Sequence, residues 1–297
     1  MKITLTGSLG HIGKPLTQEL VQKGHQVTVV SSNPEKQKDI EALSAIAAIG
    51  SVDDAAFLAT AFTGADVVYT MIPPTNYFNQ NLDVSAYCLN IGNSFAAAIR
   101  QAGVKRIIHL SSIGAHLDKN SGLILAHHEV ENILGRLQNV DITFMRPTAF
   151  YYNLFGFLGS IKSNGVIASN YGGNDVIAWV APTDIAAAIA REIATPPAHR
   201  KVQYVASDEL SCNEVAGILG TAIGKPDLQW VVIPDEQMEA EMISFGLNPG
   251  AAAGLVEMNA CMHRGELFED YFVNRPKLGT IKMTDFAKDF AAAFNQN

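Results

Sequence analysis

The chain has 297 residues, of which 48% are hydrophobic and 17% charged, and its net charge at pH 7 is -8. This composition supports a sizeable core and argues against disorder, while the acidic balance argues against a nucleic-acid partner, which would require a basic face. A chain of this length forms one large domain, or a nucleotide-binding domain with a smaller second region.

Strand and helix patterns alternate along the first half of the chain. Strands are expected at residues 2–6, 25–30, 45–49, 66–72, 105–110 and 142–145, and helices at 16–23, 36–43, 53–63, 84–102 and 129–138. This alternation predicts right-handed crossovers and a parallel sheet. The predicted fold class is therefore α/β, with a Rossmann-type doubly wound sheet.

The alternation fades after residue 150. Trp179-Val180 and the alanine-rich helix that follows, with Asp184 as its cap, are expected to return the chain to the main sheet. Further expected elements are a strand at 202–206, a helix that starts at a capping box at 211–214, and an amphipathic helix at 284–294. We expect residues 1–150 to form a dinucleotide-binding domain, and residues 151–297 to complete the sheet and form a small α+β substrate domain.

The cysteines and the apolar segments bear on the cellular compartment. Cys88, Cys212 and Cys261 are far apart and form no C-x-x-C pair, so we expect buried, reduced thiols. The first residues read as a strand rather than a signal peptide, and no apolar run is long enough to span a bilayer. We therefore expect a cytoplasmic monomer or homodimer without a membrane partner.

Three glycines, Gly7, Gly10 and Gly13, stand between the first strand and the first helix. In a dinucleotide-binding turn, the first glycine permits the tight turn, the second lets a pyrophosphate approach, and the third lets the helix pack on the strand. The helix N-terminus then offers free N–H groups and the positive end of its dipole. The predicted cofactor-binding residues of this loop are Gly7, Ser8, Leu9, Gly10, His11 and Ile12.

Ligands of open parallel sheets lie beyond the carboxyl ends of the strands, at the topological switch point. The expected crevice is therefore lined by the ends of the first, fourth and fifth strands. At the end of the fourth strand we predict Met71, Ile72 and Pro73 as cofactor contacts. Pro74 is a predicted substrate contact.

The turn after the second strand bears on the choice of dinucleotide. An acidic residue there would bind the adenosine ribose and select NAD. No carboxylate precedes Glu35, and the predicted contacts are Ser31, Ser32, Asn33 and Lys36. Hydroxyls, an amide and a cation can hold a 2′-phosphate, so NADP(H) is favoured over NAD(H).

Four motifs occur together in the sequence. They are T-G-x-x-G-x-x-G near the N-terminus, G-A-D-V-V-Y before a Pro-Pro, V-K-R-I-I-H-L-S-S, and I-T-F-M-R-P-T-A-F with Asn153 three residues on. The combination resembles the atypical short-chain dehydrogenase/reductase superfamily, in particular its NmrA-like branch. The resemblance implies a Rossmann domain with a small C-terminal substrate domain. It also implies that Thr148 and Ala149 present backbone to the nicotinamide carboxamide, and we predict Pro147 and Thr148 as cofactor contacts. Ser32 replaces the Arg that relatives use for phosphate.

The resemblance implies a catalytic set that this sequence has only in part. The superfamily uses a Ser together with Tyr-x-x-x-Lys; Ser111 or Ser112 matches the Ser, but Leu123 and His127 take the other two positions. A plain alcohol or ketone needs a group that manages its proton as hydride moves, and a leucine cannot do so. Our predicted catalytic residues are Ser111, Ser112 and His127. No metal is expected, because His127 and its neighbours lack a third ligand at suitable spacing.

Quinones and conjugated cationic dyes accept hydride without that help, because the charge delocalises. We therefore predict an NAD(P)H-dependent oxidoreductase that transfers hydride directly to a planar quinone-like acceptor, with Phe150, Tyr151 and Asn153 as further substrate contacts. One alternative is an NADP(H)-sensing regulatory protein with little turnover. Another is a nucleotide-sugar epimerase or dehydratase, which requires a different tyrosine, such as Tyr77 or Tyr151, at the nicotinamide.

Overall fold

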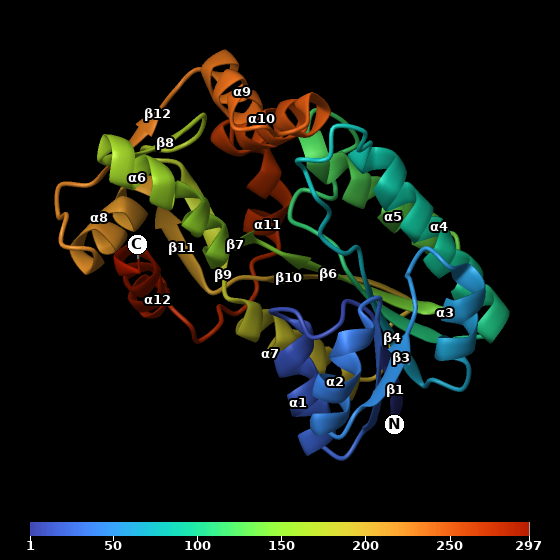
Figure 1. The fold of residues 1–297 in the computed structure, drawn as a ribbon. Coiled ribbons are helices and arrows are strands. Elements are labelled where there is room, and N and C mark those ends of the chain that lie inside the picture. The colour runs from blue at the N-terminus through green and yellow to red at the C-terminus, as the bar shows by residue number, and fades with distance from the viewer. Residues whose placement is uncertain (297) are drawn as a thin grey trace.

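A seven-stranded parallel sheet forms the centre of the first part of the molecule (Figure 1). The computed structural model describes residues 1–296. The strands are β1 (Lys2–Leu5), β2 (Gln26–Ser31), β3 (Ile46–Ile49), β4 (Val67–Met71), β5 (Arg106–Leu110), β6 (Asp141–Pro147) and β10 (Arg200–Val205). Their order is β3-β2-β1-β4-β5-β6-β10, and every neighbouring pair is parallel. The predicted α/β class with a doubly wound, Rossmann-type sheet is confirmed.

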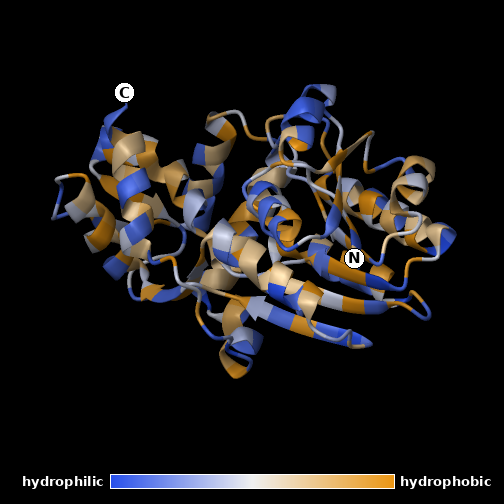
Figure 2. Cartoon of the chain, turned by 90° about the horizontal axis from the view of Figure 1, so that it is seen from below, coloured by the Kyte–Doolittle hydropathy of each residue, from blue (hydrophilic) through white to orange (hydrophobic). Residues whose placement is uncertain are grey.

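Helices cover both faces of this sheet. They are α1 (Gly13–Gln22), α2 (Gln37–Ala42), α3 (Ala55–Phe62), α4 (Val84–Ala102), α5 (Leu125–Gly135) and α7 (Pro182–Ala194). Leu16 of α1 and Ile189 of α7 share a core on one face, and Phe95 of α4 belongs to the core on the other. Figure 2 shows orange and blue segments on the same helices, which suits helices with one side toward the sheet and one toward solvent.

Local signals explain where several helices begin and end. The Asp54 carboxylate accepts hydrogen bonds from two N–H groups in the first turn of α3. Asp83 caps α4 in the same way, and α4 ends at Gly103, whose φ of 69° is in the left-handed region. Ser211 and Glu214 form the predicted capping box of α8 (Cys212–Ala222), which confirms that element.

Two small sheets and several helices make up the rest of the chain. The strands are β7 (Ala149–Phe150), β8 (Val166–Ser169), β9 (Val176–Val180), β11 (Asp208–Ser211) and β12 (Gln229–Val232). Besides α8, the α-helices of this region are α6 (Leu158–Asn164), α9 (Asp235–Ser244), α10 (Pro249–His263), α11 (Glu269–Val273) and α12 (Met283–Asn295), and its 3-10 helices are η3 (Tyr151–Phe157) and η4 (Glu266–Phe268). Two further 3-10 helices, η1 (Pro34–Lys36) and η2 (Gly122–Ile124), lie in the first part of the chain. One sheet has the order β11-β9-β7, and the other pairs β12 with β8.

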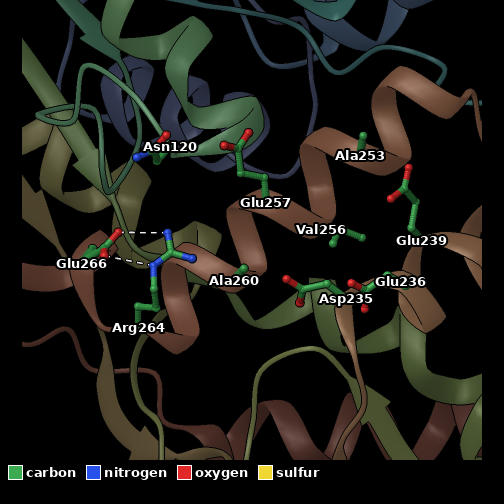
Figure 3. Close-up of a pocket in the computed structure, with 10 residues that line it drawn as sticks. All are labelled: Asn120, Asp235, Glu236, Glu239, Ala253, Val256, Glu257, Ala260, Arg264 and Glu266. Carbon is green, nitrogen blue, oxygen red and sulfur yellow. Dashed lines mark hydrogen bonds and ion pairs between the residues drawn. The ribbon is translucent and has the colours of Figure 1, made fainter.

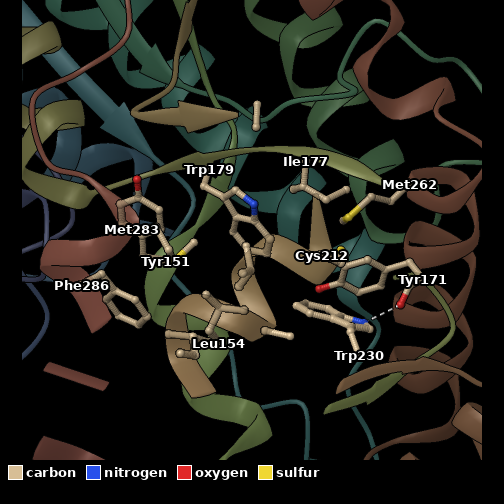
Figure 4. Packing of buried hydrophobic residues seen from close by; sticks show 14 of the residues in the cluster. Tyr151, Leu154, Tyr171, Ile177, Trp179, Cys212, Trp230, Met262, Met283 and Phe286 are labelled. Carbon is tan, nitrogen blue, oxygen red and sulfur yellow. Dashed lines mark hydrogen bonds between the residues drawn. The ribbon is translucent and has the colours of Figure 1, made fainter. Parts of the chain in front are cut away.

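An aromatic core holds this second region together (Figure 4). Trp179 and Trp230 are both buried, and their ring centroids lie 6.5 Å apart. The Trp230 indole N–H donates to the Tyr171 carbonyl oxygen at 2.7 Å, so this buried donor is paired. The region therefore has a core of its own, separate from the two cores that flank the main sheet.

The buried cysteines and the helix lengths bear on two further expectations. All three cysteines are free and buried, as predicted. Burial raises the pKa of the Cys88 thiol to about 11, so this thiol is protonated at neutral pH. Within residues 1–296, no helix combines the length and the apolar character needed to cross a bilayer.

The structure corrects the expected path between residues 176 and 205. β9 does not join the main sheet but lies in the small sheet between β7 and β11; α7 and β10 make the return instead, and β10 pairs with β6. The prediction of Asp184 as a helix cap is also wrong. Its carboxylate accepts hydrogen bonds from the Ser207 hydroxyl at 2.6 Å and from the N–H groups of Thr280 and Ile281, both at 3.1 Å. Asp184 therefore ties the last segment of the chain to α7.

Asp184→Ala is expected to lower the free energy of unfolding by about 2–4 kcal/mol, because it leaves the buried Ser207 hydroxyl and two backbone N–H groups without their acceptor. Urea denaturation measures this change. Asp39→Ala removes an exposed carboxylate of α2 and is the control, with an expected loss below about 1 kcal/mol. Equal losses in the two variants would show that Asp184 does not hold the C-terminal segment.

Candidate functional site

The glycine loop between β1 and α1 adopts a conformation that its sequence makes possible. Gly7 has a φ of 92° and Ser8 a φ of 55°, both in the left-handed region. The Ser8 N–H donates to the Val30 carbonyl oxygen of β2 at 3.0 Å. A Cβ on Gly13 would lie 2.1 Å from the Ser8 carbonyl oxygen. Only glycine therefore lets α1 start this close to the loop.

The backbone donors of this loop are free to bind a ligand. Among residues 1–296, none accepts a hydrogen bond from the N–H groups of residues 9–12, and α1 has neither a side-chain cap nor an acidic residue in its first turn. Gly10 is exposed, and a Cβ there would meet only the Gly7 carbonyl oxygen, at 3.6 Å. Free N–H groups at a helix N-terminus suit a pyrophosphate. The loop thus has the free donors and the open space that binding of a dinucleotide requires.

The end of β4 lies against the glycine loop. The Met71 N–H donates to the Thr6 hydroxyl oxygen at 3.0 Å, and a Cβ on Gly7 would lie 2.3 Å from the Met71 sulfur. Met71, Ile72 and Pro73 are partly buried. The structure therefore brings the first predicted contact of β4 to the glycine loop. Sequence reasoning missed Thr6, because a threonine at a strand end carries no distinctive pattern.

The turn after β2 divides its four predicted contacts into two kinds. Ser31 is only 3% exposed, and its hydroxyl accepts a hydrogen bond from the Ser8 hydroxyl at 3.0 Å. Ser32 and Asn33 are exposed, and Lys36 forms an exposed ion pair with a carboxylate of α2 at 3.0 Å. Ser31 thus supports the glycine loop, while the other three remain at the surface.

The end of β5 is part of a buried polar network. The Ser111 hydroxyl donates to Glu131 at 2.5 Å, and the Arg146 guanidinium donates to both oxygens of the same carboxylate at 2.9 and 2.7 Å. Arg146 also donates to the Tyr204 hydroxyl at 3.1 Å, which in turn donates to Asp270. The hydroxyl of Ser111 is therefore engaged by the protein itself. No sequence pattern pairs these residues, so the network was not predicted.

Charge stabilises the centre of this network. Burial disfavours the charged guanidinium of Arg146, but hydrogen bonding to Glu131 and the charge of that carboxylate outweigh it, so the pKa of Arg146 is raised. Ser112, in contrast, is partly buried and its hydroxyl has no partner within residues 1–296. Of the two predicted serines, Ser112 is the one with a free hydroxyl.

The loops after β5 and β6 are joined through their backbones. The Ile113 N–H donates to the Pro147 carbonyl oxygen at 2.9 Å. The N–H and the hydroxyl of Thr148 both donate to the Val205 carbonyl oxygen of β10, at 3.1 and 3.3 Å. The donors of Thr148 are thus engaged, and its carbonyl oxygen is the group that can still meet a carboxamide.

His127, in the first turn of α5, lies close to a second buried imidazole. His109 Nδ1 of β5 lies 2.9 Å from the Thr70 hydroxyl oxygen, whereas His109 Nε2 and His127 Nδ1 are buried without a partner among residues 1–296. Burial lowers the pKa of His127 to about 4; burial and the neighbouring His127 lower that of His109 to about 3. Both imidazoles are neutral at pH 7. His127 therefore does not supply the positive charge of the Lys whose position it takes.

The aromatic loop after β6 presents a different tyrosine from the one expected. Tyr151 is 1% exposed, and its hydroxyl donates to a carboxylate of β11 at 3.2 Å, so its prediction as a substrate contact is wrong for this structure. Tyr152 instead stacks on His11 of the glycine loop and on Phe150, with ring centroids 5.0 Å apart in both pairs. Asn153 is exposed. In η3 the Tyr151 side chain points into the core and the Tyr152 side chain points toward the glycine loop. The sequence does not reveal these directions.

A separate hollow of about 480 Å³ lies along α9 and α10 (Figure 3). Its lining is Asn120, Asp235, Glu236, Glu239, Ala253, Val256, Glu257, Ala260, Arg264 and Glu266. Its one lining cation, Arg264, is paired with Glu266 at 2.9 and 3.0 Å. The surplus of carboxylates makes this hollow unsuited to an anionic dinucleotide. Within residues 1–296, no group of His, Cys, Asp and Glu side chains has an arrangement suited to a metal ion.

The low pKa of His127 predicts a pH dependence of stability. The ordinary pKa of 6.5 applies to the unfolded chain and about 4 to the folded one, so between these values the unfolded state binds a proton that the folded state does not. Stability due to this group is full above pH 6.5 and falls as the pH drops, by up to about 1.4 kcal/mol per pH unit.

His127→Gln removes this titration, so the stability difference between wild type and variant is expected to change with that slope between pH 6.5 and 4.5. Urea denaturation at several pH values measures both proteins under the same conditions, which cancels the contribution of the carboxylates. Parallel pH profiles for the two proteins would contradict the low pKa.

Three solved structures are similar to this chain over nearly its whole length. An NADPH-dependent quinone oxidoreductase from Escherichia coli, solved with NADPH, has a TM-score of 0.81 and 22% identity, covering 99% of this chain and 100% of its own. The Citrobacter sp. triphenylmethane reductase with NADP(H) has a TM-score of 0.79 and 20% identity, covering 97% and 99%. A nucleoside-diphosphate-sugar epimerase from Staphylococcus aureus has a TM-score of 0.77 and 19% identity, covering 97% and 100%. These likenesses show a shared fold.

A search of curated proteins finds no match to this chain. The model of the NmrA-like family, in contrast, matches residues 1–279, which is most of the chain and includes the glycine loop, β4 to β6 and the aromatic loop. The chain belongs to the NmrA-like family.

Proposed function

We propose that this protein is an NADPH-dependent reductase of quinone-like, conjugated acceptors. The proposal rests on two features found together. The glycine loop, residues 7–13, has free N–H groups and is called the dinucleotide cradle below. The position at which the superfamily has its proton-donating Tyr holds no proton donor. Leu123 takes the Tyr position and a neutral His127 takes the Lys position. The NADPH and NADP(H) complexes among the structural neighbours support the choice of cofactor.

The glycine loop would hold the pyrophosphate through the free N–H groups of residues 9–12. At the adenosine end, Ser32, Asn33 and Lys36 are the surface groups that would meet a 2′-phosphate. The ion pair that Lys36 makes is exposed and worth no more than about 1 kcal/mol, so the lysine can exchange that partner for a phosphate. These three residues favour NADP(H) over NAD(H).

A bound NADPH would supply the hydride for the reaction. Leu123 cannot deliver a proton, and it packs against α10, where a Cβ on Gly254 would lie 2.5 Å from the Leu123 side chain. An acceptor that spreads its charge over a conjugated system can take its proton from water afterwards, whereas a simple ketone needs a proton during the transfer. His127 can donate or accept one hydrogen bond while it stays neutral.

On the acceptor side, the free hydroxyl of Ser112 and the exposed side chains of Pro74 and Asn153 are the proposed contacts. Phe150 and Tyr152 add flat surfaces, and their stack with His11 places them beside the glycine loop. Aromatic faces favour a planar substrate through offset stacking, worth about 0.5–1.5 kcal/mol for each ring pair. Tyr152 replaces Tyr151 in this part of the proposal.

Two alternatives differ from this proposal in what they require. The epimerase reading needs a tyrosine at the nicotinamide; Tyr151 is committed to the second core, which leaves Tyr77, a partly buried residue of the loop after β4. An NADP(H)-sensing protein needs only the cofactor-binding glycine loop. The engagement of Ser111 by Glu131 favours it, because one of the expected reacting groups is occupied.

We expect the purified protein to oxidise NADPH with benzoquinone, naphthoquinone and cationic triphenylmethane dyes, and to leave simple aromatic ketones unreduced. The reason is the absent proton donor at Leu123. Absorbance of NADPH under anaerobic conditions measures the rate, with each acceptor assayed without protein as the control. Stoichiometric NADPH binding with no turnover of any quinone or dye would reject the reductase and favour the sensing protein.

A further inference from the structure

The segment 74–82 leaves the crevice at the end of β4 and returns to the start of α4. Its own hydrogen bonds are local turns, such as those from the Asn79 N–H to the Asn76 carbonyl oxygen and from the Leu82 N–H to the Asn79 carbonyl oxygen, both 3.0 Å. It forms neither a helix nor a strand. Local turns alone leave such a segment free to move as a unit, so its position depends on contacts with other elements.

Asn248 supplies most of the hydrogen bonds between this segment and residues 246–248. Asn248 lies between α9 and α10 and is only 6% exposed. Its N–H donates to the Tyr77 carbonyl oxygen at 2.8 Å. Its side-chain NH₂ lies 3.2, 3.0 and 3.3 Å from the carbonyl oxygens of Asn79, Gln80 and Leu82. The two hydrogens of one amide are thus shared among three carbonyl oxygens of the 74–82 segment.

The same side chain also starts a helix. Asn248 Oδ1 accepts the Ala251 N–H at 3.1 Å and caps the N-terminus of α10. A hydrogen bond from Gln80 Nε2 to the Gly246 carbonyl oxygen at 3.0 Å runs in parallel. The donor half of the amide therefore faces the 74–82 segment, and the acceptor half faces α10.

Further along, α10 packs against the segment that precedes α5. A Cβ on Gly122 of η2 would lie 2.0 Å from the Gly254 carbonyl oxygen, so the two backbones are in direct contact. η2 leads directly into α5, which carries His127. In Figure 1, α10 lies at the edge of the molecule near α5 and α4. α10 therefore contacts both the segment after β4 and the segment before α5.

We propose that Asn248 is a positioning residue that clamps the 74–82 segment on the acceptor side of the crevice and so determines how tightly an acceptor is held. This inference rests on the proposed reductase function. The clamp acts through the segment and not through the glycine loop. It therefore affects acceptor binding and leaves NADPH binding and the hydride step unchanged.

Asn248→Asp distinguishes the role of the amide's donor from that of its acceptor. It keeps an oxygen that caps α10, but it places a carboxylate against three carbonyl oxygens of the segment. Asn248→Ser keeps a capping oxygen and replaces the amide NH₂ with a single, shorter hydroxyl without adding charge, and it serves as the second variant if the first does not fold. Asn93→Asp is the matched control, because Asn93 is an exposed asparagine whose amide donates to a single carbonyl oxygen of its own helix.

Hydrogen exchange and steady-state kinetics test the clamp together. In Asn248→Asp, the amides of residues 75–83 are expected to exchange at least about tenfold faster, while those of β1 and β5 keep the wild-type rate. The KM for a quinone rises at least about threefold, and kcat and the Kd for NADPH stay within about twofold of wild type. The control variant behaves as wild type.

Unchanged exchange in residues 75–83 would overturn the clamp, and so would faster exchange with an unchanged acceptor KM. If the wild-type protein reduces no quinone or dye, the proposed function fails. The exchange data and the NADPH titration then still decide whether Asn248 holds the segment independently of the cofactor cradle.

Discussion

The hydrogen bond from the Met71 N–H to the Thr6 hydroxyl joins β1 to β4 at the point where the strand order reverses. From β1 the chain crosses toward β2 and β3, and from β4 it crosses the other way, which opens a crevice between the two connections. Because Gly7 has no side chain, Met71 can cover it, and the glycine loop and the end of β4 become one continuous wall. The junction thus helps to fix the loop whose N–H groups are free.

A second constraint is the buried pair between Glu131 of α5 and Arg146 of β6. Taking both charges out of water is costly, and the two hydrogen bonds together with those from Ser111 and to Tyr204 compensate for it. Loss of one partner leaves a buried charge and costs about 3–5 kcal/mol. The pair therefore fixes α5, with His127, against the ends of β5 and β6. Asp270 of α11 connects the second region to the same network.

The alternation of apolar runs and glycine turns was sufficient to predict the first six strands of the main sheet and the helices between them. It predicted these features because parallel strands buried on both faces and helices with one buried side leave periodic patterns in the sequence. The small sheets escaped prediction: β8, β11 and β12 are only four residues long. Their pairing depends on contacts made across the chain.

In the candidate site, the position of the glycine loop could be predicted from the spacing of its glycines. The hydrogen-bond partners of individual side chains could not. Asp184 was predicted to cap α7, yet it binds backbone almost a hundred residues away, and Ser111 is engaged by Glu131. Tyr151 and Tyr152 are identical in type and adjacent in sequence, and only the direction of each side chain in η3 separates a core residue from a partly buried one beside the glycine loop. Long-range polar contacts leave no periodic trace.

The proposed function depends most on the binding of a dinucleotide by the glycine loop, and calorimetric titration with NADPH and NADH tests this binding directly. We predict that each chain binds one NADPH, more tightly than NADH. We also predict that Gly10→Ala, whose methyl group has room in the protein but occupies the space left for a pyrophosphate, weakens binding at least about tenfold without changing the melting temperature. Gly217→Ala on α8, whose methyl group meets no neighbouring atom within 4 Å, should bind as wild type does. Undiminished NADPH binding by the Gly10 variant, or no binding by the wild-type protein, would contradict the cradle.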